Sequence, residues 1–299
     1  MDEPTTTVSG SISLPGQTTN FAGLVTTTTR TDRLINLSSR VRVSGGDNVL
    51  ITGFAIGGTA PKQVLVRGSG PALTGFGLQG VMANPKISLY RGTELVAEND
   101  DWAAAQAADF ARLGAFALPA GSKDAALLVT LAPGAYTAIV ADGTNAGVAL
   151  AEIYDASVNP NGEYQRLVNI STRGEVTAGE GALIGGFVVT GNFPKKLLVR
   201  GIGPGLTAFG LKSALADPRL RVYRESAILA ENDTWSANAS EATATTTAAQ
   251  ATGAFALVAG SKDAALILTL APGAYTAQVT AADGSATGVA LVEIYEMSP

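Results

Sequence analysis

The sequence predicts an all-β protein: two tandem copies of one β-sandwich domain, preceded by an extended strand. Long stretches of sequence recur, so that about 130 residues occur twice. Within each copy, apolar residues alternate with polar ones or form short solid runs, and Gly, Pro and Asn stand between the runs. This pattern is typical of strands separated by turns. About eight strands and one short helix per copy favour a jelly-roll or immunoglobulin-like sandwich.

The repeat is visible in two segments with one common spacing. RLINLSSR at 33–40 recurs as RLVNISTR at 166–173, at an offset of 133 residues. VLVRGSGPALTGFGL at 64–78 recurs as LLVRGIGPGLTAFGL at 197–211, where 11 of 15 positions are identical. Internal similarity of this extent indicates two structural units of one kind.

A third segment recurs at a longer spacing. GSKDAALLVTLAPGAYTA at 121–138 returns at 260–277 with 16 of 18 positions identical and an offset of 139, so the second copy carries six extra residues. We therefore divide the chain into four parts: an N-terminal extension (1–32), repeat 1 (33–154), a linker (155–165) and repeat 2 (166–299).

The apolar pattern also gives the expected elements of the first copy. The segment 102–112 is rich in alanine and predicts a helix, while its counterpart at 236–252 is rich in threonine, a poorer helix former. The turn Ala132-Pro133-Gly134 predicts a hairpin, because Pro fixes φ and Gly permits positive φ. We expect strands near 34–43, 48–57, 63–67, 86–91, 94–98, 125–131, 135–141 and 147–154.

The composition favours assembly with neighbouring molecules. Apolar residue types make up 46% of the chain and charged types only 15%, and the mean hydropathy is +0.23. A typical soluble domain has about 25% charged residues. The surface is therefore expected to be weakly polar or covered by neighbours.

Residue counts exclude several function classes. The chain has no cysteine and no histidine, which removes thiolate nucleophiles, the Ser-His-Asp arrangement and the commonest transition-metal ligands. We expect a protein that is not an enzyme; a glycosidase with paired carboxylates is the formal exception. The net charge of −5 and the lack of basic clusters exclude a nucleic-acid binder.

The chain is expected to be exported. It contains no run of about 18 apolar residues that could cross a membrane. The start, Met1 to Pro4, lacks the basic and apolar parts of a signal peptide. We therefore expect the sequence to begin at the mature region of a secreted protein.

Two stretches carry a family resemblance. NPKISLYRGTELVAENDDW (84–102) and DPRLRVYRESAILAENDTW (217–235) are similar to the core of bacterial pre-peptidase C-terminal-like domains. More broadly, the chain beyond residue 32 resembles tandem β-sandwich modules of large secreted bacterial surface proteins. The resemblance implies an exported, non-catalytic β-module.

An acidic loop follows one strand in each copy. It contains Asn99, Asp100 and Asp101 in the first copy, and Asn232 and Asp233 in the second. Calcium prefers six to eight oxygen ligands of these types, so the loops are candidate calcium sites. Asn and Asp are also ordinary turn formers, and a structural turn is the favoured interpretation.

The two tryptophans occupy one equivalent position in the repeats. Trp102 and Trp235 each follow the acidic loop. An exposed Trp could stack on a sugar ring, whereas a half-buried one would fill the edge of a sandwich. Packing is the favoured interpretation.

Arg67 and Arg200 end an apolar run in each copy. Arginine binds carboxylates in a bidentate manner, so a clamp for an anionic ligand is one interpretation. We favour an ion pair within the domain, to a carboxylate such as Glu98 or Glu231.

The N-terminal extension predicts a strand over 5–14. Val8, Ile12 and Leu14 would lie on one face and three serines on the other. Such a strand could complete a sheet edge in its own repeat or in a neighbouring molecule. Insertion in a neighbour would give an open filament.

Two functions follow. The first is a structural subunit of an extracellular bacterial fibre, sheath or surface layer, a homopolymer that assembles through the extension. The second is an adhesion or carbohydrate-binding module for surface glycans, with calcium as its candidate cofactor.

Overall fold

The computed structural model describes residues 5–14, 17–26, 33–44, 49–143, 145–157, 165–178 and 181–297, with side chains from residue 33 onwards. The chain divides into two units, 1–31 and 32–299. Strands dominate both units, so the predicted all-β class is confirmed.

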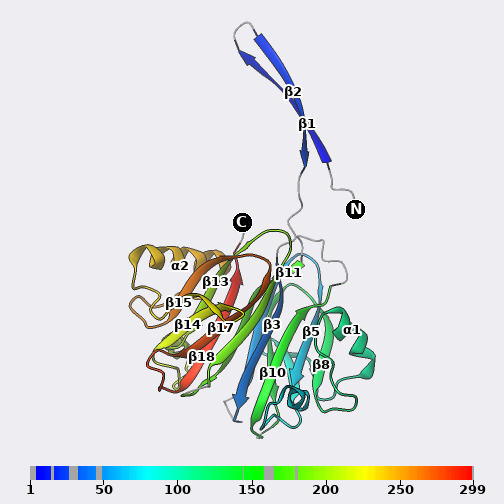
Figure 1. Cartoon of the computed structure of the whole chain (residues 1–299), viewed down its shortest axis with the longest axis vertical. Helices are drawn as coiled ribbons and strands as arrows, with labels where there is room; N and C mark the ends of the chain where they lie inside the picture. The colour runs from blue at the N-terminus through cyan, green and yellow to red at the C-terminus, as the bar shows by residue number, and fades with distance from the viewer. Residues whose placement is uncertain are drawn as a thin grey trace. The chain divides into compact units, whose positions relative to one another are not determined.

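The first unit is a β-hairpin (Figure 1). Strand β1 (Thr5–Leu14) pairs antiparallel with β2 (Gln17–Thr26), in one continuous register from Thr5↔Thr26 to Leu14↔Gln17. The strand expected at 5–14 is therefore present. The sequence pattern did not reveal β2, because apolar residues stand next to each other there and do not alternate. The residues that connect the two strands lie outside the described part.

Within its described residues the second unit contains sixteen strands, eight from each repeat, and those of repeat 1 lie where the sequence places them. The strands of repeat 1 are β3 (Arg33–Val43), β4 (Leu50–Gly58), β5 (Lys62–Ser69), β6 (Lys86–Arg91), β7 (Glu94–Asn99), β8 (Ala125–Leu131), β9 (Gly134–Ala141) and β10 (Gly147–Asp155). Those of repeat 2 are β11 (Gln165–Val176), β12 (Leu183–Thr190), β13 (Lys195–Ile202), β14 (Pro218–Arg224), β15 (Ala227–Asn232), β16 (Ala264–Leu270), β17 (Gly273–Ala281) and β18 (Gly288–Glu296).

Each repeat forms two ladders of antiparallel strands. In repeat 1 the orders are β8-β5-β10-β3 and β4-β9-β6-β7, and in repeat 2 they are β16-β13-β18-β11 and β12-β17-β14-β15. Strands of the two ladders also touch without pairing, as β5 and β8 do with β6. The ladders are therefore two layers that enclose apolar side chains.

One expected connection is different. The turn Ala132-Pro133-Gly134 was expected to close a hairpin, but β8 pairs with β5, and β9 pairs with β4 and β6. The hairpin prediction was wrong, because this turn carries the chain from one layer to the other. Turn residues reveal a change of direction and do not reveal which strands then pair.

The two repeats are joined by strand pairing. Strand β3 of repeat 1 pairs with β12 of repeat 2, and β11 of repeat 2 pairs with β4 of repeat 1. Figure 1 shows β3 and β11 at the centre of the second unit. Equivalent residues meet there: Leu34 is paired with Leu167, and the buried Thr172 Oγ1 donates to Ser39 Oγ at 2.7 Å. The joint is therefore nearly two-fold symmetric.

Close packing at the joint follows the same symmetry. A Cβ atom at Gly53 would lie 2.5 Å from Ser171 Oγ, and one at Gly186 would lie 2.7 Å from Ser38 Oγ. Each glycine thus lets a serine of the other repeat approach the backbone. The same glycine–serine contact therefore occurs twice at the joint, once on each side.

One hydrophobic core cluster contains residues of both repeats, among them Phe54 and Phe187. The repeats are therefore in continuous contact through sheets and core. The jelly-roll or immunoglobulin-like description of each repeat remains a prediction.

The helices lie in corresponding regions of the two repeats. In repeat 1, η2 (Ala104–Gln106) and α1 (Ala107–Arg112) match the predicted helix. In repeat 2, α2 (Ala239–Thr252) is longer than its threonine content suggests. Asn238 caps it by accepting from Ser240 N at 2.9 Å, and the buried Ala248 and Ala249 pack with the core residues Leu198 and Tyr295. Capping and packing outweigh the weak propensity.

We predict that residues 32–299 unfold in one transition, because the repeats share sheets and core. Each repeat has one tryptophan, so the variants Trp102→Phe and Trp235→Phe leave a fluorescent probe in one repeat only. In each variant, the urea midpoint measured by tryptophan fluorescence should equal the midpoint measured by circular dichroism, which reports on both repeats. Two separate midpoints within one variant would contradict this.

Candidate functional site

A buried ion pair lies at Arg67. Its Nε is 3.2 Å from Glu152 Oε2, and Tyr154 donates its hydroxyl proton to Glu152 Oε1 at 2.6 Å. The guanidinium also donates to the carbonyl of Phe116 at 2.8 Å and lies 4.2 Å from the centre of that ring. Arg67 therefore holds the segment around Phe116 against the sheet.

Repeat 2 contains the same cluster. Arg200 is hydrogen-bonded to Glu293, Tyr295 donates to Glu293 Oε1 at 2.8 Å, and Arg200 Nη1 donates to the carbonyl of Phe255 at 2.6 Å. Neither arginine is exposed. Each guanidinium faces partners within its own repeat. This arrangement agrees with an ion pair inside the domain and disagrees with a clamp for an external anion.

The expected carboxylate partners were wrong. Glu98 pairs with Lys86 at 2.8 Å, and Glu231 pairs with Arg221 at 2.9 Å; both glutamates are exposed, on the β6–β7 and β14–β15 hairpins. The partners of the two arginines come from the next strand in the ladder, where Glu152 of β10 is opposite Arg67 and Glu293 of β18 is opposite Arg200.

A buried aspartate organises the turn after β5. Asp124 accepts from the backbone N–H groups of Gly70 and Ala72 at 2.7 and 3.2 Å, and from Ser122 Oγ at 2.6 Å. The turn then enters the 3₁₀ helix η1 (Pro71–Phe76). Asp263 does the same for the turn before η3 (Pro204–Phe209). These carboxylates satisfy buried N–H groups that would otherwise be costly.

The candidate calcium ligands have internal partners. Asn99 Oδ1 accepts from Ala126 N at 2.9 Å, and its Nδ2 donates to the carbonyl of Asp101 at 2.9 Å. The Asp101 carboxylate pairs with Lys123 at 2.7 Å. Asp100, between them, belongs to the same loop after β7.

The loop of repeat 2 is arranged similarly. Asn232 Oδ1 accepts from Ala265 N at 3.0 Å, and Asp233 lies 3.7 Å from Arg219. Within the residues that the structure describes, no three acidic side chains come together as a metal cluster. The two asparagines thus hydrogen-bond the loop to the next strand, β8 or β16.

The tryptophans pack inside the repeats. Trp235 is 6% exposed, and its Nε1 donates to Ser261 Oγ at 3.2 Å. Trp102 is half-buried, donates to Ser122 Oγ at 3.1 Å and lies against Phe110 with ring centres 5.5 Å apart. This is the packing role that the sequence favoured.

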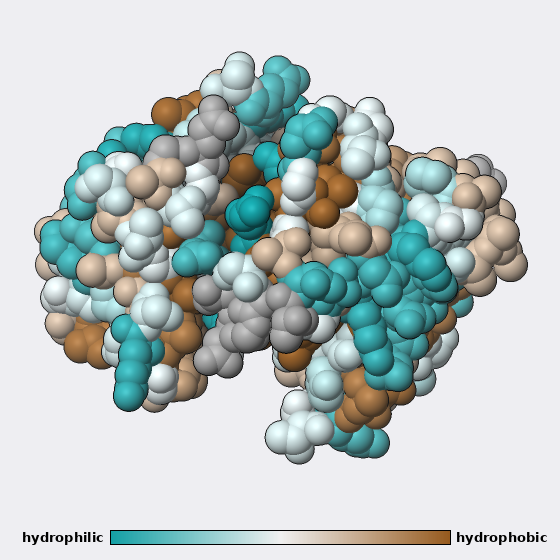
Figure 2. Space-filling view, turned by 90° about the horizontal axis from the view of Figure 1, so that it is seen from below, coloured by the Kyte–Doolittle hydropathy of each residue, from teal (hydrophilic) through white to brown (hydrophobic). Residues whose placement is uncertain are grey.

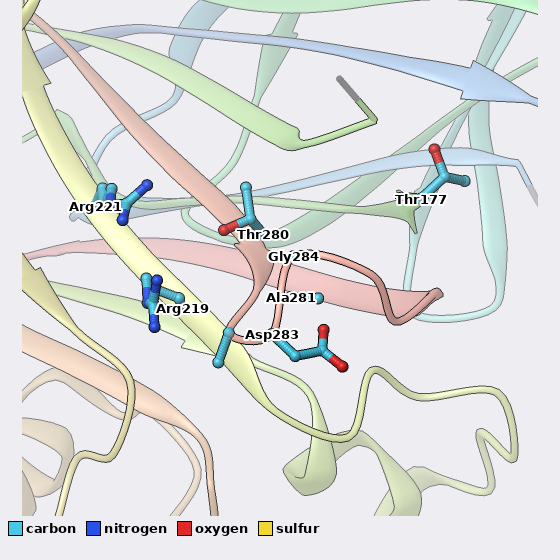
Figure 3. A pocket seen from close by; sticks show the side chains of 8 residues that line it. Thr177, Arg219, Arg221, Thr280, Ala281, Asp283 and Gly284 are labelled. Atoms are coloured by element: carbon cyan, nitrogen blue, oxygen red, sulfur yellow. The ribbon is translucent and has the colours of Figure 1, made fainter. Parts of the chain in front are cut away.

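A polar hollow of about 320 Å³ lies beside β14 (Figure 3). Arg219 and Arg221 project from the strand, and Thr280 and Asp283 come from the end of β17 and the turn after it. The backbone N–H groups of residues 285 and 286 donate to the Asp283 carboxylate and lower its pKa. No sequence motif had indicated this site.

A second hollow, of about 200 Å³, shares Arg219 with the first. Its other lining residues are Glu231, Asn232, Asp233, Thr234 and Ala237, the acidic loop of repeat 2. Both arginines that line the hollows have a carboxylate partner. The region offers hydrogen bonds at the surface and has no deep cavity.

Apolar side chains also reach the surface. Figure 2 shows them in separate groups between polar ones on one face. The large exposed apolar residues are Phe76, Leu95, Val96, Phe193, Phe209, Ile228, Leu229 and Val258. Several occupy equivalent positions in the two repeats, as Phe76 and Phe209 do, so both repeats expose apolar side chains at the same places.

The candidate assembly residues Val8, Ile12 and Leu14 lie on β1. Their side chains lie outside the described part. The strands β1 and β2 carry no charged residue.

We predict that Gly70→Ala destabilises the fold, because a Cβ atom there would lie 2.2 Å from the carbonyl oxygen of Met82. Overpacking of this kind costs about 1–3 kcal/mol. Gly75→Ala in the same motif is the control, since nothing lies within 4 Å of its added Cβ. Urea denaturation should show the loss for the first variant alone; equal midpoints would refute the close approach.

We further predict that stability falls above pH 10. Burial, with the adjacent glutamates Glu152 and Glu293, raises the pKa of Tyr154 and Tyr295 above the ordinary value of 10.0. In this range the unfolded chain loses protons that the folded chain keeps, so each tyrosine costs about 1.4 kcal/mol per pH unit.

The measurement is the free energy of unfolding between pH 9 and 11. The double variant Tyr154→Phe/Tyr295→Phe is the comparison, because it leaves the titrating lysines unchanged. Its stability should fall less steeply with pH than that of the native chain. Parallel curves would show that the tyrosines do not contribute.

Among the described residues, no helix has the length and apolar character needed to cross a membrane. Comparison with known proteins found no matching family model and no matching curated protein.

Proposed function

We propose that the chain is a non-catalytic structural subunit of an extracellular bacterial fibre, sheath or surface layer. It assembles with further copies of itself through β-strand addition by the N-terminal extension. The observation that carries the proposal is the β1–β2 hairpin, a two-stranded sheet in a unit of its own, whose two strands carry no charged residue.

Such a hairpin needs a partner to be stable. Two strands alone are marginally stable in water, and a third strand or a packing surface is usually required. Strands of ten residues can form a long row of main-chain hydrogen bonds with an exposed sheet edge. The absence of charge removes the usual device by which free strands repel further pairing.

The joint between the repeats supports the same view. Strands β3 and β4 of repeat 1 pair with strands of repeat 2, so this fold already associates through the edges of its layers. Two jelly-roll or immunoglobulin-like sandwiches joined in this way would form a single rigid subunit suited to a fibre.

The charged residues that could have served chemistry have structural partners. Arg67 and Glu152 form a buried pair, and Asp124 binds backbone N–H groups. With no histidine or cysteine in the chain, this favours a structural role over a catalytic one.

A second candidate is an adhesion or carbohydrate-binding module. It is favoured by the two polar hollows that share Arg219, since sugars are bound through several hydrogen bonds at shallow sites. The tryptophans offer it no support, because Trp235 is buried and Trp102 packs against Phe110.

We predict that the purified chain forms filaments in negative-stain electron microscopy, and that a variant without residues 1–31 stays dispersed. The truncation should leave the unfolding midpoint of the remaining residues unchanged, because they form a separate unit. Dispersed particles in both samples would refute assembly. A glycan array, with and without calcium, would then test the second candidate.

A further inference from the structure

Four strands lie at the ends of the ladders and could accept another strand. These are β7 and β8 in repeat 1 and β15 and β16 in repeat 2; each has a single paired neighbour among the described strands. An open edge presents unpaired N–H and C=O groups, and natural proteins usually protect it with charges, bulges or a cover. The four edges differ in this protection.

Strands β7 and β15 are protected. The register of β6 and β7 shifts beside Val96, and that of β14 and β15 shifts beside Leu229, so each edge strand contains a bulge. Glu94 and Glu98 add charges to β7, and Glu231 adds one to β15. Bulges and charges disfavour the addition of a further strand.

Strands β8 and β16 have neither device. Their sequences, AALLVTL and AALILTL, contain no charge and no proline, and both ladders run without a register shift. Three successive residues, Leu128, Val129 and Thr130, are at least partly exposed, as are residues 266–269 of β16. Solvent therefore reaches the second half of each strand, where Thr130 and Thr269 are exposed, while the first two residues of each strand are buried.

The hydrogen bonds of Ala126 show which way the free groups point. Its N–H donates to Asn99 Oδ1, and its carbonyl accepts from Gln106 Nε2 at 3.4 Å. Because alternate residues of a strand share one hydrogen-bonding direction, Leu128 and Thr130 direct their backbone groups to the same side. The side chains of Asn99 and Gln106 thus cover the beginning of the edge and leave its remainder open.

Repeat 2 keeps this arrangement. Asn232 Oδ1 accepts from Ala265 N, so Ile267 and Thr269 direct their backbone groups outwards in β16. The chain therefore has two equivalent open edges, one on each repeat.

We propose that β8 and β16 are the acceptor edges for the β1–β2 hairpin of a second copy. This inference rests on the proposed function and names the surface that receives the extension. The hairpin fits the edge because both are uncharged, and its ten-residue strands exceed the seven residues of β8 or β16. Donor and acceptor are different surfaces, so the contact is heterologous and can continue from copy to copy.

Lysine substitutions on the full chain test the acceptor. Thr130→Lys/Thr269→Lys places one lysine on each proposed edge, at exposed positions. Val96→Lys/Leu229→Lys is the matched control, with the same added charge at exposed positions on the bulged edge strands. Assembly is measured by sedimentation and electron microscopy, and urea denaturation verifies that both variants remain folded.

We expect the first variant to lose assembly and the control to assemble as the native chain does. If the native chain assembles through residues 1–31 but both variants also assemble, the acceptor proposal is overturned while the proposed function stands. Loss of assembly in the control alone would place the acceptor at β7 and β15 and would also overturn it. A native chain that never assembles would refute the proposed function itself.

Discussion

The structure depends on the pairing of β3 with β12 and of β11 with β4. Without these two ladders, each repeat would expose the edges of both its layers and the apolar residues beneath them. With them, the edges on this side are covered and one core cluster runs through both repeats. Close contact requires small residues on one side, which is why Gly53 and Gly186 stand opposite serines of the other repeat. Among the described strands, the ladders then end only at β7, β8, β15 and β16.

Buried charges organise the outer faces of the repeats. Burying an arginine is expensive unless its partners are close and its hydrogen bonds are made. Arg200 meets this condition through Glu293, the carbonyl of Phe255 and the Phe255 ring. Arg67 has the equivalent partners close by, but its Nε and Nη2 are buried without a hydrogen bond, so its charge is balanced by the ion pair with Glu152 alone. Each thereby ties the segment after a helix to the sheet. The repeated Arg-Gly-x-Gly-Pro segment is explained by this anchoring together with the aspartate that binds the backbone of the following turn.

Much of the fold could be predicted from the sequence, because strand positions follow from local alternation and turn residues. The repeat and the strand at 5–14 were visible for that reason. Pairing was not, since β3 and β12 are brought together by surfaces that no local pattern records. The partner of Arg67 was misjudged in the same way, because Glu152 follows it by 85 positions in sequence and is adjacent only in the ladder. The hollows beside β14 depend on three separate segments and carry no motif.

The near two-fold axis between the repeats has an evolutionary consequence. In a dimer of identical subunits, a substitution on the axis is made twice and must fit against itself. In this chain the two positions are separate, so each can change alone and be matched by the other. Ser39 and Thr172 are an example: they are equivalent but different residues, and one hydroxyl donates while the other accepts. Because both repeats belong to one chain, the residues beside this axis need not be identical.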